Sequence, residues 1–403
     1  MRQPAIIQWG ISSFFGWGIY GLNLALHWSG DQTIEPVCAS EFAPEHITVD
    51  PLRQRTLLPF LVRSLQFQEQ LKQHENGGAN ADAPLLLGLG NGFRGSPAAH
   101  NVVLEGRPTI GVIFFEEPLD AGAVLRAKQL SLIVTGSTWN ERVLRAHGID
   151  HVRTVLQGID PTHFHPAPKL GIMGDRFLIF SGGKIEMRKG QDIMMAAFKI
   201  FSKRHPDATL VTAWHSPWPH LARNLDQTRL AAPVAFDREG KFDVRAWGAA
   251  NDIPADQIMD LGNVPNISMP PILREMDIAV FPNRAEGGTN LVVMECMACG
   301  VPVILSRNTG HIDLIADDNC YPLVDQRAVE NRWNSVGDVQ CWGESQVDEI
   351  VEHLEQVYAD RAEASRRGRR AATLMKRLTW SKTAKQLKDV VLGAVKENVS
   401  KAA

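Results

Sequence analysis

The sequence predicts an α/β fold with two open parallel sheets, and three observations indicate it. Short apolar runs of strand length alternate with longer helical stretches, as in successive βαβ units. Several of these apolar runs are continuous rather than alternating, which is expected for strands covered on both faces. One segment with two prolines and a glycine, 158–166, interrupts the series. We therefore expect two domains, each with its own sheet.

The first domain is expected to comprise residues 1–165. Its predicted strands are Ala5–Trp9, Leu85–Leu89, Thr109–Phe115, Leu132–Val134 and Val152–Leu156. The uncharged stretch Gln3–Trp28 contains four glycines and several polar residues, so it favours a strand, a Gly/Ser loop and a helix (Ile19–Trp28) over a membrane span. A second helix is predicted over Arg53–Glu75, followed by a flexible surface loop over residues 76–83.

The second domain is expected to comprise residues 166–380. Its predicted strands are Phe177–Ser181, Ala208–Ala213, Ile258–Leu261, Ile278–Phe281 and Val301–Leu305. Its predicted helices are Gln191–Arg204, Met294–Cys299 and Val347–Met375. Residues 216–257 lack clean periodicity and are interpreted as an insertion. The remaining segment, 381–403, is expected to be a helix that packs back toward the first domain.

Composition, charge and cysteine content exclude several classes of protein. An apolar fraction of 44% and a charged fraction of 22% argue against a disordered, fibrous or polytopic membrane protein. Forty-two basic and 45 acidic side chains give a formal charge of −3, so no nucleic-acid partner is predicted. Five scattered cysteines favour a reducing compartment, hence a cytoplasmic location. Cys296 and Cys299 form a C-x-x-C without a second ligand pair, so no metal is predicted.

A glycine- and lysine-rich segment, Ser181–Gly190, follows the first strand of the second domain. Gly183 allows the backbone to approach a ligand closely. Lys184 and Lys189 lie five residues apart, beside the start of a predicted helix, where cations and amide groups attract a diphosphate. A solvated turn with ordinary surface lysines is the alternative, and this segment alone leaves both open.

A second motif, Arg284–Pro302, follows the strand Ile278–Phe281. Glu286 is placed at the strand end, and a turn then exposes backbone N–H groups before a helix begins; its residues are Gly287, Gly288, Thr289 and Asn290. Glu295 is placed about two turns into that helix, and a carboxylate there can accept two hydrogen bonds from a vicinal diol. The carboxyl ends of parallel strands share one edge of a sheet, so both motifs are expected at the same ligand site.

With these motifs the chain resembles the retaining glycosyltransferases of family 4. The matching text comprises Gly183-Lys184 and Lys189-Gly190, Glu286 and Glu295 with the following Cys-Met-Ala-Cys-Gly-Val-Pro-Val303, Val155–Asp160, Phe164–Pro166, Leu261–Val264 and Leu378–Trp380. The resemblance is strongest from 148 to 315. It implies the GT-B fold: two Rossmann-like domains that face a central interdomain cleft, with a C-terminal helix returning to the N-terminal domain.

The resemblance also implies an activity and roles by position. A hexose-type sugar would pass, with retention, from a nucleotide diphosphate sugar to a glycan, lipid-linked or small-molecule acceptor, without metal or other cofactor. Lys184 and Lys189 would neutralise the departing diphosphate, Glu286 would face the sugar, and Glu295 would bind the ribose. The amides of residues 287–290 would hold sugar hydroxyls and phosphate. The remaining donor contacts would come from Gly262 near the base and from Gly16 and Gly18 of the first domain.

Three departures from the family pattern stand out. Eight residues rather than seven separate Glu286 from Glu295. Lys184 stands where arginine is common, which keeps the charge but loses the bidentate fork. Where many relatives carry a histidine, this chain reads Phe114-Phe115 and then Glu116-Glu117. Either glutamate is a candidate for binding an acceptor hydroxyl, with a plain surface charge as the alternative.

Two other functions are weighed against this one. The altered glutamate spacing and the missing histidine favour an inactive protein that binds nucleotide sugars or glycans on the same scaffold. The text Gly90–Gly95 matches G-x-G-x-x-G, which indicates a dinucleotide-dependent oxidoreductase if a helix follows it. No D-x-D motif occurs, so a metal-dependent GT-A enzyme is disfavoured.

The C-terminal region from Arg366 onward is rich in lysine and arginine. A basic amphipathic helix can lie on an anionic membrane, which would suit a lipid-linked acceptor at the inner membrane surface. The alternative is a solvated helix that packs on the first domain through Leu378, Trp380 and Leu387.

Overall fold

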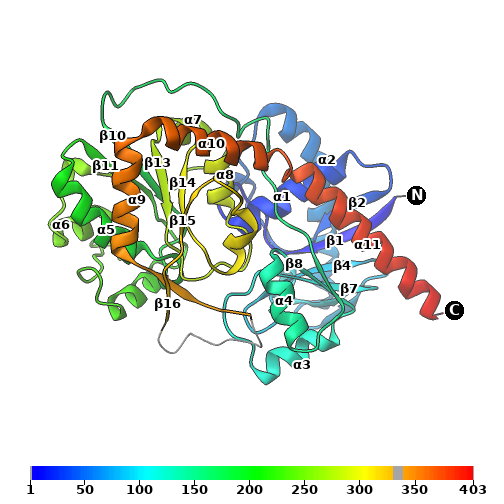
Figure 1. The fold of residues 1–403 in the computed structure, drawn as a ribbon. Coiled ribbons are helices and arrows are strands. Elements are labelled where there is room, and N and C mark those ends of the chain that lie inside the picture. The colour runs from blue at the N-terminus through cyan, green and yellow to red at the C-terminus, as the bar shows by residue number, and fades with distance from the viewer. Residues whose placement is uncertain (1, 330–338, 403) are drawn as a thin grey trace. The chain divides into compact units, whose positions relative to one another are not determined.

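The computed structural model describes residues 2–329 and 339–402, which form two compact units (Figure 1). The first unit contains Met1–Gly158, Pro265–Ile267 and Leu378–Ala403, and the second contains Ile159–Val264 and Ser268–Arg377. The chain thus passes to the second unit after Gly158, returns to the first for Pro265–Ile267, and returns again after Arg377. The sequence-based boundaries are at residues 165 and 380.

The sheet of the first unit has the strand order β2-β1-β4-β7-β8-β9. These strands are β1 (Gln3–Gln8), β2 (Ile34–Cys38), β4 (Leu85–Gly90), β7 (Thr109–Ile113), β8 (Leu132–Thr135) and β9 (Val152–Thr154), all parallel. The five predicted strands are therefore present. β2 was not predicted, because Pro36 interrupts its apolar pattern. Proline is tolerated there because β2 pairs only with β1, at the edge of the sheet.

Two predictions for the first unit are wrong in detail. Residues 76–83 do not form a loop throughout, since β3 (Gly78–Asn80) pairs in parallel with β6 (Val103–Glu105). The first helix, α1 (Gly16–Ser29), begins three residues before the predicted start, so Gly16 and Gly18 lie in its first turn rather than in a loop. The next helix, α2 (Pro51–Leu71), begins after Asp50, whose carboxylate accepts from the backbone N–H groups of Leu52 and Arg53. The unit also contains α3 (Ala121–Gln129) and α4 (Thr138–Ala146).

The C-terminal helix α11 (Trp380–Ala402) packs within the first unit, beside α1 (Figure 1). The indole N–H of Trp28 donates to Ala384 O at 3.0 Å, and the hydroxyl of Thr383 donates to Leu156 O at 2.9 Å. A side chain at Gly158 would lie 2.3 Å from the backbone of Thr379, so this approach requires glycine. The predicted return of the C-terminal helix to the N-terminal domain is confirmed.

The sheet of the second unit has the strand order β12-β11-β10-β13-β14-β15, and all neighbours are parallel. Its strands are β10 (Phe177–Gly182), β11 (Ala208–Ala213), β12 (Ile258–Asp260), β13 (Ile278–Phe281), β14 (Val303–Ser306) and β15 (Tyr321–Leu323). Counted along the unit, this order is 3-2-1-4-5-6, the doubly wound Rossmann arrangement. The order reverses between β10 and β13.

The helices of the second unit are α5 (Gln191–Arg204), α6 (Val244–Ala250), α7 (Met269–Glu275), α8 (Leu291–Ala298), α9 (Val347–Ala359) and α10 (Arg361–Met375). The single helix predicted over Val347–Met375 is wrong. It breaks at Asp360, whose carboxylate accepts from Glu363 N and caps α10. Part of the predicted insertion, 216–257, is helical, since α6 connects β11 to β12. Within the described residues, no helix combines the length and the apolar character that a bilayer crossing requires.

Candidate functional site

The two predicted motifs meet where the strand order of the second sheet reverses. The segment Gly183–Gly190 follows β10, and the segment Pro282–Asn290 follows β13. These strands pair directly, with Ile179 opposite Ile278. Their carboxyl ends therefore lie side by side, at the position where open α/β sheets bind ligands.

A buried ion pair joins the two segments. Lys189 Nζ lies 2.6 Å from Glu286 Oε2, and less than 10% of either side chain is exposed. Asn283 Nδ2 donates to the same oxygen at 2.8 Å, and Arg188 Nη1 lies 3.3 Å from it. These three contacts all involve Oε2, so one carboxylate oxygen of Glu286 is committed to the protein.

The charges around Glu286 keep it ionised. Burial alone would raise the pKa of its carboxyl, but the cations Lys189 and Arg188 lower that pKa to about 2. Burial lowers the pKa of the Lys189 amine, while the carboxylate of Glu286 opposes the change. At neutral pH Glu286 can therefore accept hydrogen bonds but cannot donate a proton.

The two predicted lysines have different surroundings. Lys184 is one-third exposed, and its Nζ lies 3.9 Å from Glu186 and 5.0 Å from the ring centroid of Trp218. The backbone next to it is held by Gln191 Nε2, which donates to Lys184 O at 2.9 Å. Lys184 is therefore a partly exposed cation, whereas Lys189 is buried within the site.

Arg284 supports both loops and was missed by the sequence reasoning. It is completely buried, and its guanidinium donates to both carboxylate oxygens of Asp192 at 2.8 and 2.7 Å. It also donates to Glu344 at 2.7 Å and to Met187 O at 2.8 Å. Asp192 is in the first turn of α5, and Met187 precedes the Lys189 loop, so Arg284 ties the end of β13 to the loop that follows β10. A pairing between residues 92 apart leaves no local signal in the sequence.

The turn between β13 and α8 contains the remaining predicted donor residues. Gly287 and Gly288 are followed by Thr289, which is buried and whose hydroxyl donates to the thioether Sδ of Met294 at 3.0 Å. Asn290 adopts a left-handed backbone, with φ of 64°, directly before α8. Glu295 lies on α8 and is buried. The helix begins three residues earlier than predicted, because the apolar run Leu291–Val293 is already helical.

Asn290 leads to a buried histidine that the sequence reasoning also missed. Asn290 Nδ2 lies 3.2 Å from His311 Nε2, and Ser306 Oγ lies 2.9 Å from His311 Nδ1. His311 follows β14 and is fully enclosed. Burial lowers the pKa of its imidazole to about 4, a change that Glu286 opposes and Lys189 reinforces. The ring is therefore neutral at physiological pH.

Because of His311, the protein is expected to lose stability as the pH falls from about 6.5 toward about 4. In this window the unfolded chain binds a proton that the folded chain excludes, so unfolding becomes more favourable. The full loss corresponds to about 3 kcal/mol. Urea denaturation at a series of pH values measures it, and the His311→Gln variant should show a flatter profile between these limits. Equal slopes in both proteins would contradict the assignment to His311. The pKa of Glu286 affects stability only below its ordinary value of 4.5.

Gly262 follows β12 and has a left-handed backbone, with φ of 69°. Its N–H donates to Asp260 Oδ1 at 3.4 Å, and Asp260 Oδ2 lies 2.9 Å from His215 Nε2. The side-chain hydrogen bond raises the pKa of His215. Asp260 ends β12, and His215 follows the neighbouring strand β11, so the loop predicted near the base lies at the same sheet edge as Lys189 and Glu286.

The other predicted residues belong to the first unit. A side chain at Gly18 would lie 2.2 Å from Ser12 Oγ, so close packing of the preceding segment accounts for this glycine, while Gly16 is exposed at the start of α1. Glu116 and Glu117 follow β7, and Glu116 N donates to Asn91 Oδ1 at 3.0 Å. Both glutamates are partly exposed, as the acceptor-side role requires.

The dinucleotide motif Gly90–Gly95 does not have the structure that its proposed function requires. Gly90 ends β4, and Gly95 belongs to β5 (Arg94–Gly95), which pairs antiparallel with β4. The next helical segment is only the 3₁₀ turn Ala99–Asn101. Without a helix N-terminus after the glycines, there is no pyrophosphate site of the Rossmann type here.

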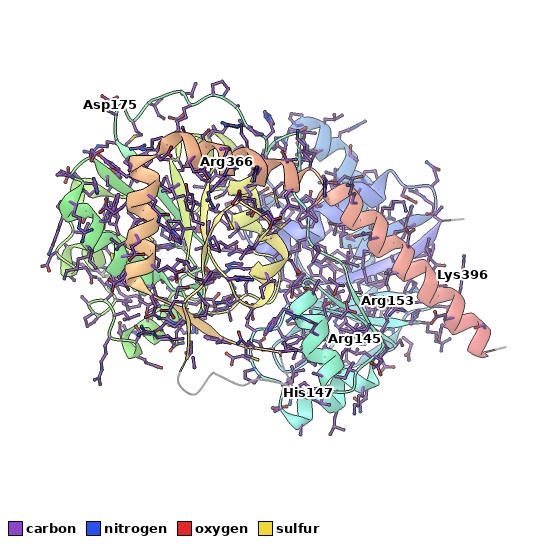
Figure 2. The ribbon with its side chains drawn as sticks, viewed as in Figure 1. Arg145, His147, Arg153, Asp175, Arg366 and Lys396 are labelled. Carbon is purple, nitrogen blue, oxygen red and sulfur yellow. The ribbon has the colours of Figure 1, made fainter. Side chains whose placement is uncertain are left out.

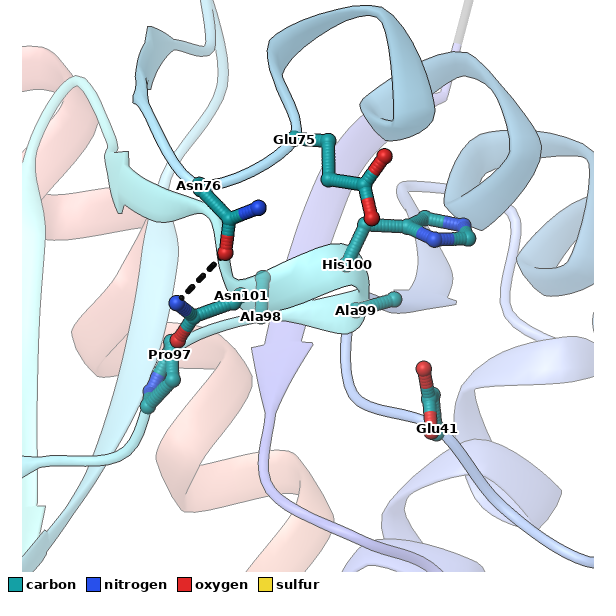
Figure 3. Close-up of a pocket in the computed structure, with 8 residues that line it drawn as sticks. All are labelled: Glu41, Glu75, Asn76, Pro97, Ala98, Ala99, His100 and Asn101. Carbon is teal, nitrogen blue, oxygen red and sulfur yellow. Dashed lines mark hydrogen bonds between the residues drawn. The ribbon is translucent and has the colours of Figure 1, made fainter.

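A separate pocket of about 460 Å³ opens on the first unit (Figure 3). Its lining residues are Glu41, Glu75, Asn76, Pro97, Ala98, Ala99, His100 and Asn101. Asn101 Nδ2 donates to Asn76 Oδ1 at 2.9 Å across it (Figure 3). None of the predicted site residues lines this pocket.

Much of the basic charge near the C-terminus is paired. Arg366, labelled in Figure 2, lies 2.5 Å from Glu363 and 3.6 Å from Asp318. Arg367 also contacts Glu363, and Arg370 contacts Asp318. These arginines of α10 therefore have acidic neighbours within their own unit.

Comparisons with known proteins agree with the two motifs. A family model described as "Family 4 Glycosyltransferase in conflict systems" matches residues 269–387. The GDP-mannose-dependent alpha-(1-6)-phosphatidylinositol monomannoside mannosyltransferase of Mycolicibacterium smegmatis is 26% identical over 196 residues, which are 45% of each chain. The chain spans about half the length of the curated relatives it matches.

Two solved structures resemble the whole chain. Sucrose-phosphate synthase from Thermosynechococcus elongatus has a TM-score of 0.63 at 13% identity and covers 100% of both chains. Anabaena Alr3699/HepE in complex with UDP has a TM-score of 0.59 at 13% identity, over 98% of this chain and 100% of the other. At such low identity these likenesses concern the fold, and they confirm the predicted GT-B class.

Proposed function

We propose that this chain, which belongs to the family 4 glycosyltransferases, transfers a hexose-type sugar from a nucleotide diphosphate sugar to an acceptor hydroxyl. The observation that carries the proposal is the Lys189–Glu286 pair at the reversal of strand order. It places a cation and a carboxylate beside the glycine-bearing turn Glu286–Asn290, at the sheet edge where such folds bind ligands.

Each residue has a role that its surroundings support. Lys189, with Lys184 closer to solvent, stabilises the negative charge that develops on the departing diphosphate. Glu286 accepts a hydrogen bond from a sugar hydroxyl through Oε1. It does not act as a general acid, since its pKa is about 2. Glu295 binds the two ribose hydroxyls.

We propose that the transfer proceeds with retention and without a metal. The bond from the sugar's anomeric carbon to the diphosphate oxygen breaks, and a bond to the acceptor oxygen forms on the same face. The acceptor's proton passes to the departing diphosphate, so the step does not require a protein base. In this scheme the protein supplies positive charge and position rather than a nucleophile.

The acceptor that we propose is a glycan, a lipid-linked sugar or a small molecule, with Glu116 or Glu117 as a hydrogen-bond acceptor for its hydroxyl. A cytoplasmic location, with peripheral contact at the inner membrane surface, would suit a lipid-linked acceptor. Because Arg366, Arg367 and Arg370 of α10 are paired with carboxylates, that contact would depend mainly on lysines of α11 such as Lys382.

The function is tested by thermal unfolding of the full chain with UDP, GDP and ADP, followed by hydrolysis assays with the corresponding nucleotide sugars. A ligand that binds the native state raises the unfolding temperature, so one nucleotide should stand out. Slow hydrolysis of its sugar without acceptor would distinguish an enzyme from an inactive binding protein. If no nucleotide stabilises the protein, the proposal is wrong.

Glu295→Gln is expected to weaken binding of the preferred nucleoside diphosphate about tenfold, since hydrogen bonds to charged groups contribute about 1.5 to 3 kcal/mol. Calorimetric titration measures the loss. Glu355→Gln on α9 is the matched control, because Glu355 is a carboxylate of the same unit that pairs with Arg204 and His205 rather than with residues of the site. If both variants bind the nucleoside diphosphate with equal affinity, Glu295 does not contact the nucleotide.

A further inference from the structure

Three consecutive residues after β14 hold the turn between β13 and α8. Thr309 Oγ1 accepts from Glu286 N at 2.8 Å, and Gly310 N donates to Glu286 O at 2.9 Å. His311 Nε2 lies 3.2 Å from Asn290 Nδ2. Both ends of the turn Glu286–Asn290 are therefore bound to one short segment, Thr309–His311.

The middle of the turn is held by contact. A side chain at Gly310 would lie 1.9 Å from Gly288 O and 2.8 Å from Glu286 O, so the turn packs directly on the Gly310 backbone. Thr309 has φ of 40°, a left-handed conformation that is uncommon for a β-branched residue. Such strain persists only where the surrounding structure enforces it. Here the Thr309 hydroxyl also donates to Asn308 Oδ1 at 3.0 Å.

His311 can bind Asn290 and Ser306 at the same time because its ring is neutral. In the arrangement seen, Nε2 accepts from the amide of Asn290, so Nδ1 carries the proton and donates to Ser306 Oγ. This fixes the side chain of Asn290, whose left-handed backbone sets the direction in which α8 begins. His311 contacts the turn through the side chain of Asn290 and is completely buried.

We propose that Thr309–His311 form a clamp that holds the turn Glu286–Asn290 in its sugar-binding shape, and that His311 acts as a positioning residue through Asn290. The inference rests on the proposed function, because it assigns this turn to the donor sugar. The clamp explains how Glu286 Oε1 and the turn amides stay aligned without direct contact between His311 and the substrate. It predicts that His311 affects recognition of the sugar more than recognition of the nucleotide.

The test compares nucleotide sugars with free nucleotides in the His311→Ala variant. We expect the dissociation constants of the probes UDP-glucose and GDP-mannose, whichever the wild type binds, to rise about tenfold. The constants for UDP and GDP should change less than about threefold. His311→Gln, which can accept from Asn290 and donate to Ser306, should restore sugar recognition. A purely structural histidine would weaken both classes of ligand alike.

Two further variants complete the test. Asn290→Gly keeps the left-handed backbone and removes only the amide, so it should reproduce the His311→Ala effect, and the double variant should be no worse than either single one. His205→Ala, at the end of α5, removes a histidine bound to Glu355 and should leave sugar recognition unchanged. If His311→Ala does not fold, Asn290→Gly tests the same contact.

The outcomes separate the clamp from the proposed function. Wild-type protein that binds a nucleotide sugar, with unchanged selectivity in His311→Ala or Asn290→Gly, would overturn the clamp alone. Additive losses in the double variant would also overturn it, since they would mean that His311 and Asn290 act independently. Wild-type protein that binds no nucleotide or nucleotide sugar would overturn the proposed function, and the clamp with it.

Discussion

Lys189→Met is expected to lower turnover of the preferred nucleotide sugar at least about a hundredfold, the scale seen when one charge-stabilising group is removed. Methionine fills a similar volume, so the variant removes the ammonium rather than the packing. Its partner Glu286 would keep its contacts with Arg188 and Asn283, and the proposed diphosphate site would lose a buried cation. Steady-state kinetics with saturating acceptor, or donor hydrolysis without acceptor, measure the effect.

Two comparisons identify the cause of that loss. Lys199→Met on α5 removes a half-exposed lysine that pairs with Asp252 on the surface, and it should leave turnover unchanged. The double variant Lys189→Met/Glu286→Gln removes both members of the buried pair. The double variant should be more stable than Lys189→Met, because no unpaired buried carboxylate is left. It should not recover turnover, because the ammonium of Lys189 is still missing. Near wild-type turnover in Lys189→Met would remove this residue from the catalytic site.

The loops of the site could be predicted because local patterns specify them. The apolar run Phe177–Ser181 followed by glycines, and the run Ile278–Phe281 followed by Glu286, each identify a strand and the turn after it. Parallel strands place such turns at one edge of the sheet, and the structure places Lys189 against Glu286 there. The direct pairing of β10 with β13 comes from the structure, and the spacing of the motifs does not show it.

The supporting residues could not be predicted, because their partners are remote in sequence. Arg284 lies inside the second motif, yet nothing local indicates that it binds Asp192 rather than solvent. His311 lies beyond the motif, and an isolated histidine is more often a core residue than part of a site. The break at Asp360 is different in kind. Asp360 is an N-cap residue with Glu363 three positions later, a local pattern that indicates a new helix. The apolar periodicity continues across Asp360, and this continuity favoured a single helix.

Arg284→Met is expected to destabilise the second unit by about 3 to 5 kcal/mol, the usual effect of removing one partner from a buried ion pair. Asp192 is almost completely buried, and without the guanidinium its carboxylate would keep, among the side chains that the structure describes, the hydroxyl of Thr228, 2.6 Å away. The carbonyl of Met187 would lose its side-chain donor at the same time and keep only the backbone N–H of Gly190 at 3.2 Å among the described residues, which would loosen the loop that carries Lys189. Urea denaturation followed by tryptophan fluorescence measures the loss of stability.

The matched control is Arg204→Met, which breaks a half-exposed pair with Glu355 on the same unit and should cost about 1 kcal/mol or less. Arg284→Lys should fall between the two, since lysine keeps the charge but cannot bind both oxygens of Asp192 and also reach Met187 O. If Arg284→Met is no less stable than the control, the buried network does not support the loop. If Arg284→Met is less stable than the control but its folded form keeps wild-type turnover, the buried network stabilises the unit without positioning Lys189. Urea denaturation and turnover, measured on the same variants, therefore separate the effect of Arg284 on stability from its effect on the chemistry at the sheet edge.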